Sequence, residues 1–168
     1  MNWGKRSFGG VRYDLTHLDP ATVTVSCPKG ERADLTVRIQ FGAHVFSQSW
    51  KVGDPEDMKC MDGTTARCFC PIRYGHSLHL ASIVERGLNG RVLVSPQRKF
   101  VLFGNPPGVA QPYSVFFLMR GLKNPPFDGA VDVVSAYERP HLRPMPGMAG
   151  YDLLDMMRAG KFQWPKKK

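Results

Sequence analysis

Four apolar segments follow one another between residues 92 and 137: VLV (92–94), KFVLF (99–103), YSVFFL (113–118) and VDVVSAY (131–137). Prolines and glycines separate them, at Ser95-Pro96, across residues 104–112 and at Pro125-Pro126. Short strands at this spacing, with turn residues between them, are typical of an antiparallel meander. The run therefore predicts the body of one sheet.

An earlier pair of segments predicts a hairpin. Val23–Ser26 reads as a short strand, and Leu35–Phe41 alternates apolar and polar residues with period two. Pro28-Lys29-Gly30 supplies turn residues between them. We expect an antiparallel pair with one face in solvent.

Helical periodicity appears twice. Residues 80–88 carry apolar side chains at four-residue steps, which predicts a central helix from Ser77 to Gly87 with Ser77 as its N-cap. A short C-terminal helix is predicted over residues 151–159, ending at Gly160.

The rest of the chain predicts little regular structure. Residues 1–20 are loop-like, with apolar residues that indicate an arm packed on the body, and residues 42–72 read as mostly irregular. Residues 161–168 form a basic tail. We expect residues 1–168 to form a single α+β domain: an antiparallel sheet, made of the N-terminal hairpin and the C-terminal meander, with one central and one short C-terminal helix.

Composition bounds the class of protein. The chain has 168 residues, 42% hydrophobic and 22% charged, which fits a soluble globular protein. No apolar run approaches the roughly 20 residues that a membrane helix needs. The N-terminal residues lack the apolar stretch of a signal peptide. We expect a cytoplasmic protein without a membrane partner.

The positive charge is unevenly distributed. The net charge is +9, and residues 1–60 contribute only one unit of it, with eight Lys/Arg against seven Asp/Glu. The other eight units fall in residues 61–168, the segment that holds the predicted meander. Such a distribution is typical of a polyanion binder. A basic surface without any partner is the alternative.

The cysteines raise the question of zinc. Cys60, Cys68, Cys70 and His44 have the ligand types of a structural site. However, one residue separates Cys68 from Cys70, where zinc loops have two to four. Reduced cysteines that act as small hydrophobes are therefore favoured, and no cofactor is predicted.

Histidines are the first candidates for acid–base chemistry, because the imidazole pKa lies near neutral pH. His76 stands three residues before His79 at the predicted helix start, with Arg73 nearby. A phosphate there would meet backbone N–H groups, His76 and Arg73. The alternative is a histidine with only a capping role. His44, at the end of an alternating strand, is a further candidate.

The end of the last strand offers a second group. Alternation places Ser135 and Tyr137 on one face, opposite Ala136, and Arg139 follows on that side. Ser, Tyr and Arg together can hold a phosphodiester and stabilise its developing charge. Alternatively, Tyr137 only marks a sheet margin. The predicted nucleic-acid-binding residues are Arg67, Arg91, Arg98, Lys99 and Arg139.

Several chemistries find no motif in the chain. There is no Gly-x-x-x-x-Gly-Lys-Ser/Thr loop, Gly-x-Gly-x-x-Gly, Gly-x-Ser-x-Gly or His-Glu-x-x-His. The carboxylates are scattered, which argues against a two-metal nuclease. A metal-free nuclease remains compatible with the residues.

The order of a helix and then an antiparallel sheet ending in Ser-Ala-Tyr resembles the group of small metal-free RNases that includes barnase, EndoU, colicin and RelE-like domains. The resemblance covers residues 73–139. It implies that His76, Arg73, Ser135 and Tyr137 surround a scissile phosphate, although no glutamate base stands in a matching position. The chain is also similar to uncharacterised proteins of bacterial mobile elements in His44–Ser47 and Arg67–Tyr74.

These observations predict a metal-independent, toxin-like RNA-cleaving domain, with RNA rather than DNA as its partner. The alternative is a non-enzymatic accessory or inhibitor protein that binds nucleic acid or an acidic protein.

Overall fold

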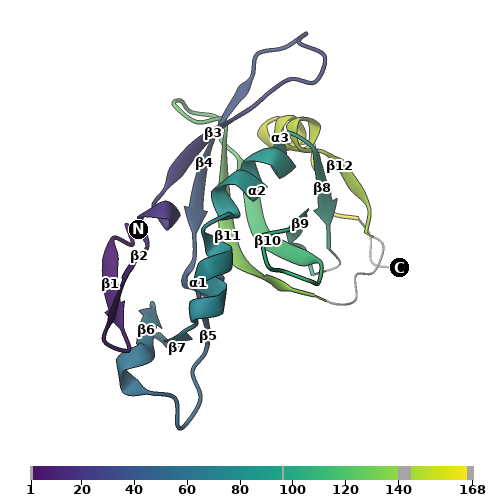
Figure 1. Cartoon of the computed structure of the whole chain (residues 1–168). Helices are drawn as coiled ribbons and strands as arrows, with labels where there is room; N and C mark the ends of the chain where they lie inside the picture. Colours follow the sequence, from purple (N-terminus) through teal and green to yellow (C-terminus); the bar gives the residue numbers. More distant parts are fainter. Residues whose placement is uncertain (1, 96, 140–144, 166–168) are drawn as a thin grey trace.

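The computed structural model describes residues 2–95, 97–139 and 145–165. In this part of the chain a seven-stranded sheet forms the body, and two small sheets lie beside it (Figure 1). The strands of the large sheet are, in spatial order, β12 (Gly147–Ala149), β8 (Arg91–Val94), β9 (Phe100–Gly104), β10 (Tyr113–Gly121), β11 (Gly129–Glu138), β4 (Leu35–Phe41) and β3 (Ala21–Val25). The predicted α+β class is confirmed. Lys166–Lys168, the last three residues of the predicted tail, lie outside the described residues, as does His141.

The predicted meander is confirmed. Strands β8, β9, β10 and β11 pair in chain order, each antiparallel to the next. The predicted hairpin is also confirmed, because β3 and β4 pair antiparallel. The two parts join through a parallel pairing of β4 with β11, which the sequence did not predict. As a result, all seven strands share one sheet.

Two short helices replace the predicted central helix. Helix α1 spans Pro71–Ser77 and α2 spans Leu80–Leu88. Pro71 starts α1, where its missing N–H leaves no helical hydrogen bond unmade. Ser77 is therefore the buried last residue of α1, and its predicted N-cap role is wrong. His76 likewise lies in the last turn of α1, so the prediction that it stands at a helix start is also wrong.

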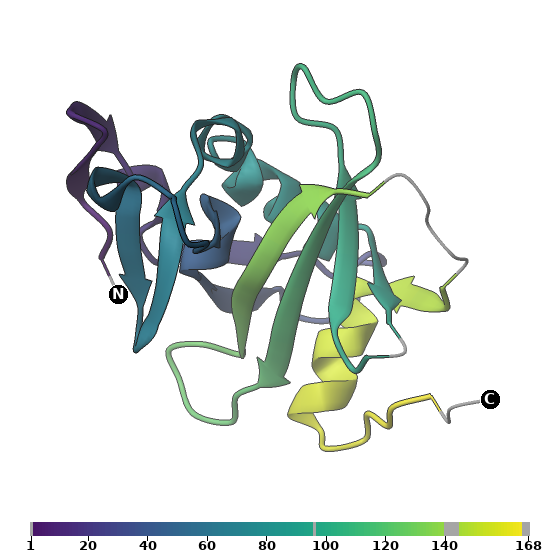
Figure 2. The same ribbon diagram turned by 90° about the horizontal axis from the view of Figure 1, so that it is seen from below.

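Helices α2 and α3 cover the same face of the sheet. Helix α3 (Gly150–Arg158) confirms the predicted C-terminal helix and packs on β10 (Figure 2). Gly87 of α2 lies so close to the sheet that a Cβ there would come 2.5 Å from Leu102. A Cβ at Gly129 would likewise meet Leu154 of α3 at 2.7 Å. By strand alternation and register, Leu102 and Gly129 belong to one face, so the core lies between this face and the two helices.

A β-bulge interrupts β11. Phe116 lies opposite Ser135 but Phe117 lies opposite Val133, so Val134 is an extra residue. The bulge places Asp132 and Ser135 on the same face, the one turned away from α2 and α3, whereas strict alternation would place them on opposite faces. Ser135 and Tyr137 stand opposite Ala136 as predicted. The inward residue before them is Val133, not Val134.

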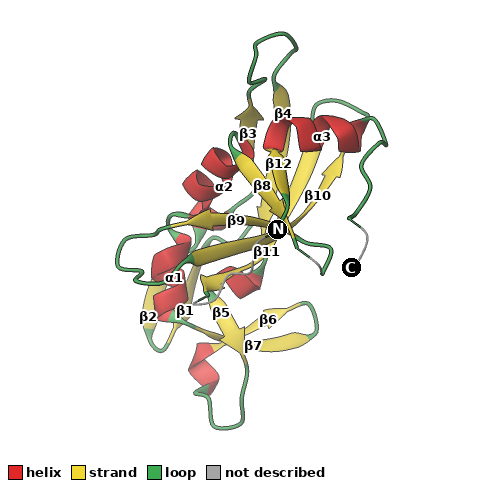
Figure 3. Ribbon diagram, turned by 90° about the vertical axis from the view of Figure 1, so that its right-hand side faces the viewer, coloured by secondary structure: helices red, strands yellow, loops and turns green. Residues whose placement is uncertain are grey.

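Two regions that read as loops contain strands. Residues 1–20 hold the hairpin of β1 (Lys5–Phe8) and β2 (Val11–Asp14), followed by a 3-10 helix at Thr16–Leu18. Residues 42–72 hold β5 (Ser47–Ser49), β6 (Lys59–Asp62) and β7 (Thr65–Phe69), which form a three-stranded sheet below the large one (Figure 3), and two 3-10 helices, η2 (Ala43–Val45) and η3 (Glu56–Met58). The loop predictions were wrong because strands of three to five residues are too short to show a clear period. The packing of the arm on the body is confirmed: Phe8 stacks on Phe69 with ring centroids 4.2 Å apart.

Candidate functional site

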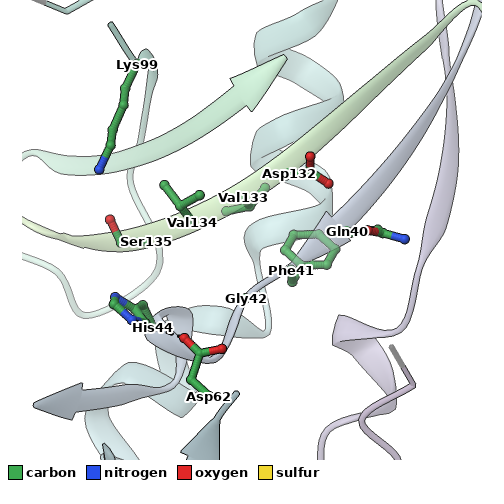
Figure 4. A pocket seen from close by; sticks show the side chains of 10 residues that line it. All are labelled: Gln40, Phe41, Gly42, His44, Asp62, Lys99, Asp132, Val133, Val134 and Ser135. Atoms are coloured by element: carbon green, nitrogen blue, oxygen red, sulfur yellow. Dashed lines mark ion pairs between the residues drawn. The ribbon is translucent and has the colours of Figure 1, made fainter. Parts of the chain in front are cut away.

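A groove of about 450 Å³ opens on the face of the sheet that α2 and α3 leave uncovered. Its walls come from β4, η2, the β6–β7 hairpin, β11 and the turn before β9 (Figure 4). The lining residues are Gln40, Phe41, Gly42, His44, Asp62, Lys99, Asp132, Val133, Val134 and Ser135. Four stretches that are distant in the sequence, at residues 40–44, 62, 99 and 132–135, therefore meet at one site.

His44 reaches the groove because η2 is held tightly against β11. The Gly42 N–H donates to the Val133 carbonyl at 2.9 Å, and a Cβ at Gly42 would come 3.3 Å from the same oxygen. Ala43 and Val45 are buried on either side, so the side chain between them turns outward. The sequence predicted an exposed edge position for His44, and the structure places it on a single turn of 3-10 helix.

Burial and the charges of neighbouring side chains set the pKa of His44. Partial burial lowers the pKa of His44, and the nearby positive charges of Arg67, Arg73 and Lys99 lower it further. Asp62 opposes them, since its Oδ2 lies 3.2 Å from His44 Nε2. The net direction is downward, which favours a neutral imidazole at neutral pH. A neutral imidazole that carries its proton on Nε2, the nitrogen next to the Asp62 carboxylate, can accept a proton at Nδ1.

Two arginines stand behind η2. Arg67 is only 4% exposed, and it donates to Ser47 Oγ at 2.7 Å and to the Ser47 carbonyl at 3.1 Å. Arg73 donates to the carbonyls of His44 (3.2 Å) and Ser47 (2.7 Å). Neither arginine forms a salt bridge with any residue that the structure describes. Their positive charges therefore reach the groove, where the Asp62 carboxylate offsets part of the charge of Arg67.

Lys99 and Ser135 complete the polar end of the groove. Figure 4 shows the Lys99 ammonium and the Ser135 hydroxyl pointing toward one another, above His44. Asp132 lies further along the groove and is paired with Arg120 at 3.2 Å. The end nearest His44 thus combines an ammonium, a hydroxyl and an imidazole, which are groups that bind and transform phosphate esters.

The structure brings together some of the predicted site residues. His44, Ser135 and Lys99 line the groove. Arg73 and Arg67 lie behind η2, and the Tyr137 ring centroid is 5.9 Å from the Arg73 guanidinium carbon. These residues form one neighbourhood, in which Lys99, predicted as a nucleic-acid-binding residue, lines the groove together with His44.

Other predicted residues lie elsewhere. His76 does not line the groove, and its ring packs edge-on against buried Tyr113 at 5.6 Å. Arg91 lines a different groove, and Arg98 is exposed in the β8–β9 turn. Arg139 lies 5.9 Å from the Phe116 ring, outside the groove lining. Asp62 was not among the predicted site residues, although the dipeptide Asp62-Gly63 is a turn signal in the sequence.

The four cysteines are free thiols, and burial raises the pKa of Cys60 and Cys68. Over the described ranges, no three His, Cys, Asp or Glu side chains gather as metal ligands. The set of Cys60, Cys68, Cys70 and His44 is therefore not assembled as a zinc site. Among the same residues, no helix has the length and apolar character to cross a membrane.

The fold and groove define a class: an α+β protein whose mixed sheet carries helices on one face and a polar, histidine-bearing groove on the other. The model of the YjaZ family matches residues 5–152, and the chain belongs to the YjaZ family. No curated protein and no solved structure matches the chain. The match runs from the β1–β2 hairpin to the start of α3, so it includes every element of the groove.

Proposed function

We propose that this protein binds RNA in the His44 groove and cleaves it without a metal ion. The observation that carries the proposal is the proton-accepting histidine, His44, beside Lys99 and Ser135 in a groove backed by Arg67 and Arg73. These three cations belong to the segment that holds eight of the nine net positive charges. A positive potential of this kind attracts a phosphodiester backbone.

The chemistry follows from the groups present. His44 takes the proton of a ribose 2′-hydroxyl, whose oxygen attacks the adjacent phosphorus. The bond from phosphorus to the 5′-oxygen breaks, that oxygen takes a proton from water, and protonated His44 returns its proton to the hydroxide that remains. The products are a 2′,3′-cyclic phosphate and a 5′-hydroxyl. Lys99 and Ser135 stabilise the charge that develops on the phosphate oxygens.

The remaining residues act by position. Asp62 holds the His44 ring through Nε2, as a carboxylate does for a catalytic imidazole. Arg73 fixes η2 through two carbonyls and lies beside Tyr137. The resemblance to metal-free RNases implied His76 as the acid or base. The proposal gives this role to His44, because His44 is the histidine in the groove.

The test is cleavage of a labelled single-stranded RNA by the full chain in EDTA. We expect cleavage by the wild type and a loss of about 10²- to 10⁴-fold in His44→Ala, the range for removal of a general base. His76→Ala is the matched histidine control and should retain activity. Lys99→Ala should weaken cleavage, whereas Lys29→Ala, in the exposed β3–β4 loop, should not.

Two outcomes would overturn the proposal: intact RNA with the wild type, or equal rates for the wild type and His44→Ala. A toxin-like role adds a cellular readout. Expression of the wild type in a bacterium should arrest growth, and expression of His44→Ala should not.

A non-enzymatic nucleic-acid-binding role is the second candidate. Its support is the half-buried ring of Tyr137, which stacks on the buried ring of Phe116 at 5.3 Å between centroids, with Arg139 near Phe116. Aromatic and guanidinium groups together bind single strands without chemistry. This candidate predicts binding that weakens steeply with salt and is unchanged in His44→Ala. Binding to one acidic protein, with no affinity for RNA, would contradict both candidates.

A further inference from the structure

A second groove, of about 420 Å³, lies between the C-terminal half of α2 and the end of β9. Arg86, Arg91, Phe103 and Asn105 line it, and it shares no lining residue with the His44 groove. We propose that this second groove binds one nucleotide unit, with its phosphate on the two arginines and its base on Phe103.

Close backbone packing builds the floor of this groove. A Cβ at Gly87 would come 2.5 Å from Leu102, and a Cβ at Gly104 would come 2.8 Å from Ile83. Helix α2 therefore rests directly on β9 at two glycines that themselves line the groove. Because both contact points belong to regular elements, the groove has a fixed shape, which favours ligand binding.

The cationic wall has two members. Arg86 Nε donates to the Ser82 carbonyl one turn earlier at 3.3 Å, which orients the guanidinium and leaves its terminal nitrogens for a ligand. Arg91 is exposed at the start of β8. In the described part of the chain no carboxylate lines the groove, and neither arginine forms a salt bridge. Paired guanidinium forks match the oxygens of a phosphate.

The requirement for both arginines follows from the helix. The groove lies beside the C-terminal end of α2, where the helix dipole places partial negative charge. This charge repels an anion. The partial negative charge of the helix end cancels part of the positive charge of one arginine, so phosphate binding requires the second arginine as well.

Phe103 distinguishes a nucleotide from a simple phosphate. Its side chain is 43% exposed, in the middle of a strand where Phe100, Val101 and Leu102 are buried. An exposed aromatic side chain that lines the same groove as two arginines offers a surface on which a base can stack. The Asn105 amide offers both a donor and an acceptor to the edge of that base. A ligand that makes all three contacts, through its phosphate, the face of its base and the edge of its base, is a nucleotide.

The nucleotide unit has two sources, a free mononucleotide or one residue of an RNA strand. Isothermal titration separates them, with adenosine 5′-monophosphate, adenosine, inorganic phosphate and a single-stranded oligonucleotide as ligands. We expect the monophosphate to bind with a Kd of about 1 mM or below, and the two fragments at least about tenfold more weakly. Tighter binding of the oligonucleotide through the same residues would identify a strand as the source.

Variants test the assignment of each group. Arg86→Ala and Arg91→Ala should each weaken monophosphate binding about fivefold or more, and Arg12→Ala, an exposed arginine on β2, should not. Phe103→Leu keeps an apolar side chain and should reduce affinity for the monophosphate but not for inorganic phosphate. Monophosphate binding is judged on Arg86 and Arg91, which the cleavage proposal does not use, so this inference and the proposed RNA cleavage can fail separately. No saturable binding by the wild type, or unchanged binding in both arginine variants, would overturn the inference.

Discussion

Arg67 is a charged side chain that the fold removes almost completely from water. Burial lowers the pKa of Arg67, but a guanidinium stays protonated in proteins, so the charge persists. Its cost is offset by hydrogen bonds to Ser47, whose hydroxyl in turn donates to the Ala43 carbonyl at 2.6 Å. Arg67 therefore fixes the turn that carries His44 and also adds positive potential behind it.

Replacement of Arg67 tests this structural role. Arg67→Met keeps much of the buried volume and removes the hydrogen bonds to Ser47. We expect the free energy of unfolding to fall by about 1.5–3 kcal/mol, the range for hydrogen bonds that involve a charged group. Urea denaturation measures the change. Arg12→Met, on the exposed face of β2, is the control and should leave the urea midpoint unchanged; an equal loss in both variants would contradict the role given to Arg67.

At the scale of single residues, the sequence predicted which side chains would lie near one another better than it predicted the elements that carry them. His44, Arg73, Ser135 and Tyr137 were all candidates, and the structure places them in one neighbourhood. The sequence could not show that His44 is a better candidate for acid–base chemistry than His76, because the two histidines differ only in their surroundings in the folded protein. His44 is surrounded by Arg67, Arg73 and Lys99, whereas His76 packs against an aromatic ring.

At the scale of elements, the contact of α2 with β9 supports both the core and the second groove. Gly87→Ala would place a methyl group 2.5 Å from Leu102. We expect a loss of about 1–3 kcal/mol from overpacking, although alanine favours a helix by about 1 kcal/mol over glycine. Thermal or urea unfolding measures the balance.

Gly75→Ala is the matched control for Gly87→Ala. Gly75 is also helical, in α1, and a Cβ there meets nothing within 4 Å. The same substitution should therefore be neutral or stabilising by up to about 1 kcal/mol. Equal destabilisation by the two variants would show that packing on Leu102 is not the cause.

The elements themselves were predictable to different degrees. Strands β8 to β11 and helix α3 were found because their apolar periods are long or are bounded by clear turn residues. The parallel pairing of β4 with β11 was not, because nothing local marks which strand will lie beside another. The break between α1 and α2 was missed because Leu78 and His79 fit a helical pattern, yet Leu78 is 51% exposed.

At the scale of the whole molecule, two histidines link stability to pH. Burial lowers the pKa of both His17 and His44 below the ordinary value of about 6.5. As the pH falls through 6.5, the unfolded chain therefore binds protons before the folded chain does. Their contribution to stability is complete above that value and declines as the pH falls toward the lowered, folded-state pKa values.

We therefore expect urea midpoints to fall between pH 7 and pH 5.5. The double variant His17→Gln and His44→Gln lacks both groups, so its midpoint should change less over this range. A midpoint that rises on acidification, or an unchanged slope in the double variant, would contradict the assignment.

Because of the bulge at Val134, the number of residues in β11 determines which of its side chains face the groove. In a strand with strict alternation, insertion or deletion of two residues keeps the following side chains on their faces, whereas insertion or deletion of one residue moves them to the opposite face. Here the odd residue is already present, and it keeps Asp132 and Ser135 on the groove side while Val133 and Ala136 remain in the core. Among relatives of this chain, insertion or deletion of one residue between positions 132 and 135 would place the groove residues on either side of it on opposite faces of the sheet. This would hold even if every other amino acid were unchanged.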